Sequence, residues 1–213
     1  MIKKNKGTLI LTSIVLLIPI LIGLILWNQL PDQLVTHWDG NGVPNGYSSK
    51  LFAVLGLPIF LLAVHWICIF ATSADPKNKT LNIKLIAIVL WICPITSLFC
   101  AMAVYAEALG FSLRVELCAQ IFVGTLFIIL GNYLPKCEQN YTVGIKLPWT
   151  MSSTENWNRT HRFAGPIWVL GGAVMIISIF WNFLIVTLLV TFVVILIPVI
   201  YSYWYYKKYE ENF

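Results

Sequence analysis

The chain has 213 residues, of which 59% are hydrophobic and only 11% are charged. A soluble globular domain carries about 25% charged residues, so this composition excludes an ordinary soluble enzyme, a disordered protein and a nucleic-acid-binding protein of the usual basic type. It favours an integral membrane protein. The net charge of +5 is then read first as a signal of membrane topology.

Charged residues divide the sequence into apolar runs of membrane-spanning length. A bilayer core of about 30 Å requires about 20 apolar helical residues. Uncharged runs of this order occur at 7–31, 51–74, 85–106 and 117–135. The fifth run, 163–206, is about twice as long as one span needs, so we place a tight turn at its polar break, Trp181-Asn182. The sequence therefore predicts an all-α integral membrane protein with six transmembrane helices.

The lysines and arginines indicate how these helices are oriented. Twelve of the fourteen fall on the side that holds both termini, and only Lys50 and Arg114 fall on the other side. Because basic residues are retained in the cytoplasm, both termini are predicted to be cytoplasmic. We expect residues 1–72 to form an N-terminal two-helix unit and residues 73–213 to form a four-helix unit.

The first loop, at about 29–50, is predicted to lie outside the cell. Its Asp-Gly and Asn-Gly pairs favour turns, because glycine accepts positive φ. One interpretation is an ordered surface that binds a ligand, and the other is a compact cap on the helix ends. A metal site is disfavoured, since only two candidate ligands are present. The candidate binding residues are His37, Trp38, Asp39, Gly40, Gly42 and Tyr47.

The second long loop, at about 133–163, is predicted to be cytoplasmic. Ser152 or Ser153 can cap a short helix in which Trp157 and His161 share one face. This helix is expected either to lie along the inner membrane surface or to dock a cytoplasmic partner. The candidate residues of this loop are Asn132, Asn140, Gly144, Lys146, Pro148, Trp149, Thr150, Trp157 and Arg162.

Few ionisable side chains fall within the predicted spans. His65 lies deep in the second span, and Glu107 and Glu116 lie near the outer ends of the third and fourth. Such residues are candidates for a proton or ion pathway, but for His65 the sequence favours an interhelical hydrogen bond over such a pathway. The sequence contains no nucleophile–base pair, no phosphate-binding loop and no zinc-binding spacing among its five cysteines. We therefore expect no catalytic activity, no metal and no cofactor.

Two patterns resemble those of a known family. Leu30-Pro31, Thr36-His37-Trp38, Gly42 and Lys50 resemble the small membrane domain that opens SdpI-type proteins. The second pattern of the SdpI family is similar to Gly131-Asn132, Asn140, the run Gly144–Thr150, Trp157 and Arg162. Lys146 stands where the family usually has arginine, so a bidentate contact of the arginine type is not expected there.

The resemblance implies a six-helix, multi-pass protein of the bacterial plasma membrane. The best-known family member gives immunity against a sporulation-delay toxin, and it also holds a small DNA-binding repressor at the membrane. The expected function is therefore self-protection against a secreted membrane-active antimicrobial peptide or bacteriocin. The expected partners are this toxin, the lipid bilayer and a helix-turn-helix repressor, with no direct binding of nucleic acid. A small secondary transporter of ions or peptide is the alternative, and a protein that only senses the toxin is a further one.

Overall fold

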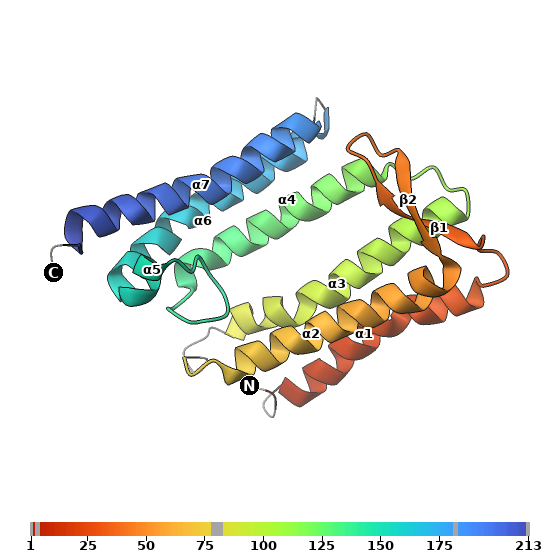
Figure 1. The fold of residues 1–213 in the computed structure, drawn as a ribbon, viewed down its shortest axis with the longest axis horizontal. Coiled ribbons are helices and arrows are strands. Elements are labelled where there is room, and N and C mark those ends of the chain that lie inside the picture. The colour runs from red at the N-terminus through yellow and green to blue at the C-terminus, as the bar shows by residue number, and fades with distance from the viewer. Residues whose placement is uncertain (1, 3–4, 78–82, 181–182, 212–213) are drawn as a thin grey trace. The chain divides into compact units, whose positions relative to one another are not determined.

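The computed structural model describes residues 2, 5–77, 83–180 and 183–211 (Figure 1). Within these residues, six helices are long and apolar enough to cross a membrane. The predicted helical membrane fold with six spans is therefore confirmed, with a two-stranded hairpin in addition to the helices, whereas the cytoplasmic location of the termini stays a prediction. The chain forms two compact units, which comprise Met1–Ala74 with Ile86–Glu116, and Asp75–Leu85 with Leu117–Phe213. Residues 86–116 thus belong to the same compact unit as the N-terminal part of the chain. The predicted division of the chain into units 1–72 and 73–213 stays a prediction.

The first unit contains three membrane helices and a β-hairpin. Its elements are α1 (Lys6–Ile25), β1 (Gln33–Trp38), β2 (Pro44–Ser49), the π-helix η2 (Phe52–Gly56), α2 (Leu57–Ala74) and α3 (Ile83–Ala108). Gly23 of α1 has no side chain to separate it from its neighbours. A Cβ at this position would lie 2.5 Å from the Tyr105 hydroxyl and 2.6 Å from Val54. The glycine therefore permits the close packing of α1 against α3 and η2.

The hairpin is the main difference from the sequence prediction in this unit. The turn predicted at residues 39–42 is present, but the Asn45-Gly46 pair, which was also expected to form a turn, lies within β2. Residues on both sides of the turn form antiparallel strands, with Leu34 opposite Ser48 and Val35 opposite Tyr47. The strands are short and their register shifts twice between Val35 and Trp38. Such irregular strands lack the sustained alternation that identifies a strand from sequence.

The second unit contains the other three membrane helices. Its elements are α4 (Val115–Tyr133), which begins in the first unit, η4 (Leu134–Lys136), α5 (Pro148–Ser152), α6 (Thr154–Ile177), η5 (Ser178–Phe180) and α7 (Phe183–Tyr209). The turn predicted at Trp181-Asn182 lies outside the described residues. The short helix predicted after Ser153 is the first part of α6, which continues into the membrane span without a break.

Glycines bring α4 and α6 together in the second unit. A Cβ on Gly124 would lie 2.8 Å from the carbonyl oxygen of Gly172, and a Cβ on Gly131 would lie 2.8 Å from that of Gly165. The two glycines of each helix are seven residues apart and so recur on nearly the same face. Small residues of this kind let helix backbones approach closely inside a membrane.

Candidate functional site

The hairpin is anchored to one end of the first unit (Figure 1). Leu30 and Leu34 are buried with Val54 and Tyr105, and Trp38 packs against the same cluster. Lys50, directly after β2, lies 3.4 Å from the Asp32 carboxylate and donates a hydrogen bond to the carbonyl oxygen of Trp27. These contacts hold the hairpin in a fixed position on the helix ends.

The turn of the hairpin is stabilised by its own side chains. The Asp39 carboxylate accepts hydrogen bonds from the backbone N–H groups of Asn41 and Val43, at 2.8 and 2.9 Å. Gly42 has a φ of +79°, which favours glycine over other residues. A Cβ on Gly42 would also collide with the carboxylate of Glu116, so the turn lies directly against this side chain. Asp39 and Gly42 therefore shape the turn.

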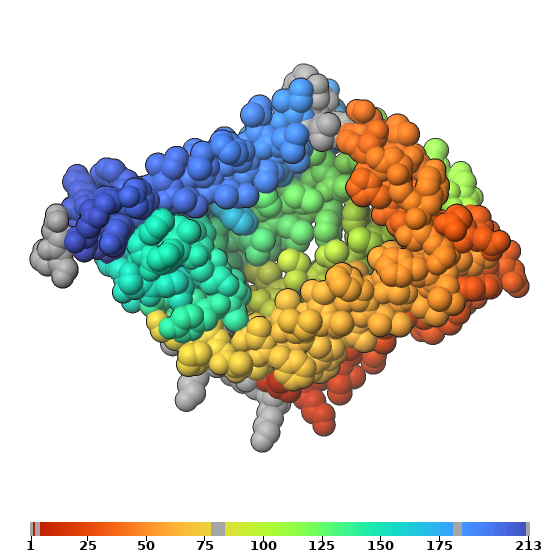
Figure 2. All heavy atoms as spheres, viewed as in Figure 1, coloured from red at the N-terminus to blue at the C-terminus, as the bar shows by residue number. Residues whose placement is uncertain are grey.

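The exposed face of the hairpin consists of other residues. Tyr47 is 61% exposed and Val43 is 55% exposed. His37 is also exposed, and its Nδ1 lies 2.5 Å from Oδ1 of Asn45. Trp38 is half-buried, and its indole nitrogen has no hydrogen-bond partner among the described residues. Of the predicted binding residues, His37 and Tyr47 are thus the ones that a ligand can contact most directly (Figure 2 shows the hairpin in orange).

Glu116 contacts the turn of the hairpin, while the other two ionisable candidates, Glu107 and His65, lie elsewhere. Its carboxylate lies 3.0 Å from Arg114, and its side chain is only 11% exposed. Glu107 is half-buried near the end of α3. His65 is fully buried in α2, and its Nε2 lies 3.1 Å from the Thr12 hydroxyl of α1. That contact is the interhelical one considered from the sequence, and no hydrogen bond or ion pair among the described residues links His65, Glu107 and Glu116 to one another.

The connection between α4 and α6, residues 137–153, is folded around a buried amide. Asn140 has no exposed surface. Its Oδ1 accepts hydrogen bonds from the backbone N–H groups of Thr142 and Val143, and its Nδ2 donates to the carbonyl oxygens of Glu138 and Val143. An asparagine satisfies this turn because it offers both an acceptor and two donors. The α4–α6 connection is therefore ordered from within.

Residues after α2 fasten the same connection from a second direction. Asp75 is only 5% exposed, and its carboxylate accepts hydrogen bonds from the Tyr141 N–H and the Thr142 hydroxyl. Lys77 donates to Oε1 of Gln139 at 2.6 Å. Asp75 and Gln139 were not among the sequence candidates, because nothing in the local sequence indicates that Asp75 meets Tyr141 or that Lys77 meets Gln139.

Trp157 and His161 of α6 pack against the α4–α6 connection. Their rings stack with centroids 4.1 Å apart, and both side chains are buried. The Trp157 indole donates to the carbonyl oxygen of Cys137 at 2.7 Å, and Nε2 of His161 accepts from the N–H of Ile145 at 2.9 Å. Gly144, with a φ of +126°, rests on these two rings, where a Cβ would collide. Trp157 and Gly144, two of the predicted docking residues, are therefore packed inside the connection, and the docking role of this region stays a prediction.

Cys137 is buried inside the connection. Burial raises the pKa of its thiol from 9.0 to about 11, although the Asn140 side chain partly opposes the shift. The thiol can then donate a hydrogen bond to the carbonyl oxygen of Val143 at neutral pH. Since the folded state keeps the proton that the unfolded state loses above about pH 9, this group's contribution to stability is present below that pH and falls as the pH rises towards 11.

Cys137 should react slowly with thiol reagents while the protein is folded. In a variant in which Cys137 is the sole cysteine, a pKa about two units higher lowers the thiolate fraction at pH 8 by about 100-fold. Labelling by a maleimide, followed by mass spectrometry, should be slower by at least this factor in detergent than in denaturant. Equal rates in the two conditions would show that the connection is open.

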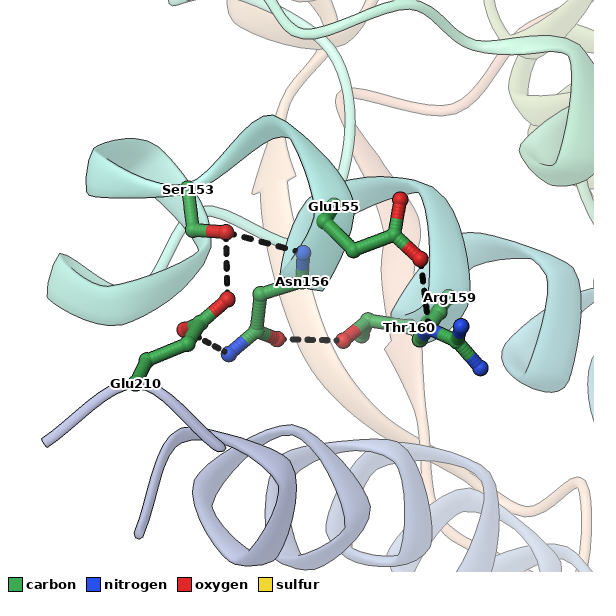
Figure 3. Close-up of polar contacts among 6 residues, drawn as sticks. All are labelled: Ser153, Glu155, Asn156, Arg159, Thr160 and Glu210. Carbon is green, nitrogen blue, oxygen red and sulfur yellow. Dashed lines mark hydrogen bonds and ion pairs between the residues drawn. The ribbon is translucent and has the colours of Figure 1, made fainter. Parts of the chain in front are cut away.

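A second polar network ties the beginning of α6 to the end of α7 (Figure 3). Ser153 caps α6 by accepting from the N–H of Asn156, and its hydroxyl donates to the carboxylate of Glu210. Asn156 donates to the other carboxylate oxygen of Glu210 at 3.0 Å. Trp149 donates from its indole to the Ser202 hydroxyl at 2.9 Å. The connection and both helices therefore form one structural block within the second unit.

The predicted docking residues thus separate into two groups. Asn140, Thr150 and Trp157 are fully buried, and Gly144 and Trp149 are half-buried in the contacts described above. The exposed members are Asn132, Lys146, Pro148 and Arg162. Lys146 donates to the backbone carbonyls of Tyr141 and Thr142, so it also closes the turn.

Comparisons with known proteins match both the region that contains the hairpin and the region that contains the α4–α6 connection. Residues 136–202 match the SdpI/YfhL protein family, and residues 14–62 match a domain of unknown function, DUF1648. The chain is 27% identical over 214 residues to the immunity protein SdpI of Bacillus subtilis strain 168, and the alignment covers 97% of each protein. No solved structure matches the chain. The resemblance to the SdpI family is therefore confirmed, and the chain is a multi-pass protein of the plasma membrane.

Proposed function

Starting from the SdpI/YfhL region at residues 136–202 and the likeness to an immunity protein over almost the whole chain, we propose that this protein gives immunity against a secreted, membrane-active peptide. The observation that carries the proposal is the 27% identity to the immunity protein SdpI over 97% of both chains. The protection is non-catalytic. It depends on binding the peptide at the membrane before the peptide inserts.

The hairpin is the proposed toxin-binding surface. It has a fixed shape, set by the Asp39 turn and the packing of Leu34, and it exposes Tyr47 and Val43. A rigid surface binds with less loss of conformational entropy than a mobile loop, and tyrosine is a frequent anchor in interfaces. These properties support the hairpin as the part of the chain that selects the peptide.

The α4–α6 connection is the proposed contact for a cytoplasmic helix-turn-helix repressor. Its interior is closed by Asn140 and Trp157. The exposed members of the family pattern, in the connection and in the two helices that it joins, are Asn132, Lys146, Pro148 and Arg162. Toxin binding would change the affinity of this surface for the repressor. The family resemblance, rather than a contact in the structure, supports this second role.

Expression in a bacterium that is sensitive to the sporulation-delay toxin tests the immunity function. Cells that produce the protein should survive toxin concentrations that kill cells carrying an empty vector. Survival that disappears when the membrane gradient is reduced by a sublethal ionophore dose would favour the transporter alternative. The absence of any protection would contradict the proposal for this toxin.

Tyr47→Ala should lower the protective effect at least about tenfold, which corresponds to about 1.4 kcal/mol of binding. The protein level should stay normal, because the ring is 61% exposed and supports no buried cluster. Tyr141→Ala is the matched control, since this tyrosine is 54% exposed but lies in the α4–α6 connection. The toxin concentration that halves survival is the measurement. An equal effect of both substitutions would exclude the hairpin as the selective surface.

A further inference from the structure

An open groove runs between the first half of α6 and the last part of α7, where tyrosines recur between residues 201 and 209. Its polar part, of about 370 Å³, is lined by Glu155, Asn158, Arg159, Arg162, Phe163 and Tyr201. Its apolar part, of about 360 Å³, is lined by Phe163, Ile197, Ile200, Tyr201 and Trp204. The two parts share Phe163 and Tyr201, whose rings stack 4.2 Å apart. The two parts therefore adjoin at this ring pair, and together they form a groove with a charged end and an apolar end.

The charged end contains two guanidinium groups, one of which forms an ion pair with a glutamate while the other is exposed to solvent. Arg159 donates to the Glu155 carboxylate at 2.6 Å and lies over the ring of Tyr205 (Figure 3 shows the ion pair). Arg162 is exposed, and no hydrogen bond or ion pair joins it to another described residue. Two arginines against one glutamate give the end a net positive charge, and an arginine fork matches the geometry of a phosphate.

The apolar end lies where a lipid chain would contact the protein. Ile200 is 56% exposed and Ile197 is 38% exposed, on a helix that is apolar enough to span a membrane. Trp204 is 48% exposed, and the amino group of Lys208 lies 4.9 Å from its ring. Tryptophan and lysine at the end of a span mark the headgroup level of the bilayer. Arg162 is the last charged residue before the apolar run of α6, so it reaches the same level.

We propose that this groove binds an anionic phospholipid. The phosphate pairs with Arg162 and with the free edge of Arg159, and an acyl chain lies along Phe163, Ile197 and Ile200. A soluble phosphate would use only the charged end, whereas a lipid uses both ends at once. The groove therefore fits a lipid better than a free anion. The bound lipid would also brace α6 against α7, next to the Ser153–Asn156–Glu210 network.

Native mass spectrometry of the purified full-length protein tests this proposal. The protein is mixed in detergent with phosphatidylglycerol or with phosphatidylcholine of the same acyl chains. Wild-type protein should retain phosphatidylglycerol in preference to phosphatidylcholine. Arg162→Gln should lower the retained phosphatidylglycerol about fivefold, the effect of one basic residue near an anionic headgroup. Arg114→Gln is the matched control, because this arginine lies in the first unit, and it should have no effect.

A second measurement separates a lipid from a free anion. Inorganic phosphate, added at equal concentration, should fail to displace phosphatidylglycerol, and Phe163→Ala should weaken the retention of the lipid. Equal retention of the two lipids, or unchanged retention in Arg162→Gln, would overturn the proposal. Complete displacement by inorganic phosphate would reduce the site to an anion site. None of these readouts depends on the toxin, so they are independent of the immunity function.

Discussion

Trp157→Ala should lower the stability of the folded protein by about 3–5 kcal/mol, the usual cost of removing a buried aromatic side chain. The ring has no exposed surface, stacks on His161 and donates a hydrogen bond to the carbonyl oxygen of Cys137. The substitution leaves a cavity under the α4–α6 connection and an unpaired buried carbonyl. Thermal unfolding of the purified protein in detergent measures the effect.

Two further variants make the Trp157 result specific. Trp157→Phe keeps a ring for stacking but loses the indole donor, so its midpoint should lie between those of wild type and Trp157→Ala. Phe192→Ala removes an aromatic ring that is 62% exposed on α7, and it should change the midpoint little. If Trp157→Ala unfolds at the wild-type temperature, the connection is not held by this ring.

Gly131→Leu should prevent the second unit from assembling. A Cβ on Gly131 would lie 2.8 Å from the Gly165 carbonyl oxygen and 2.8 Å from the Val169 nitrogen, and backbone atoms cannot move aside as a side chain can. The contact between α4 and α6 is then lost, along with the close packing that drives helix association in membranes. We expect little or no monodisperse protein after detergent extraction, measured by fluorescence-detected size-exclusion chromatography.

Gly7→Leu is the control for this substitution. Gly7 also lies in a helix, but apart from its own helix backbone and adjacent residues, no atom of the described residues lies within 4 Å of a Cβ built there. This variant should give the wild-type elution profile. A wild-type profile for Gly131→Leu as well would mean that α4 and α6 do not pack through their glycines.

The six spans followed from the sequence because charge is the dominant signal in a membrane protein. In lipid, each uncharged run of about 20 residues satisfies its backbone hydrogen bonds by forming a helix. Even the double-length run 163–206 was divided correctly into α6 and α7, although the residues of its turn lie outside the described structure. The glycine contacts were missed, because they become visible only when the positions in α4 and α6 are paired.

The candidate sites were less predictable, since they depend on contacts between distant segments. The sequence predicted that Trp157 and His161 lie on one face of a helix. In the structure, this face contacts the α4–α6 connection at Cys137 and Ile145. Asp75 bonds to Tyr141, and no local pattern could have revealed this pairing. In the first loop, the turn chemistry at Asp39 was readable, while the strands beside it were not.

Leakage from proteoliposomes tests most directly the central claim that the protein blocks a membrane-active peptide by binding it. Vesicles loaded with a fluorescent dye, with and without the purified protein, are exposed to the sporulation-delay toxin in the absence of any ion gradient. We expect the protein to lower dye release, and Tyr47→Ala to restore much of it. Equal dye release with and without the wild-type protein, or protection that requires an imposed gradient, would contradict the claim.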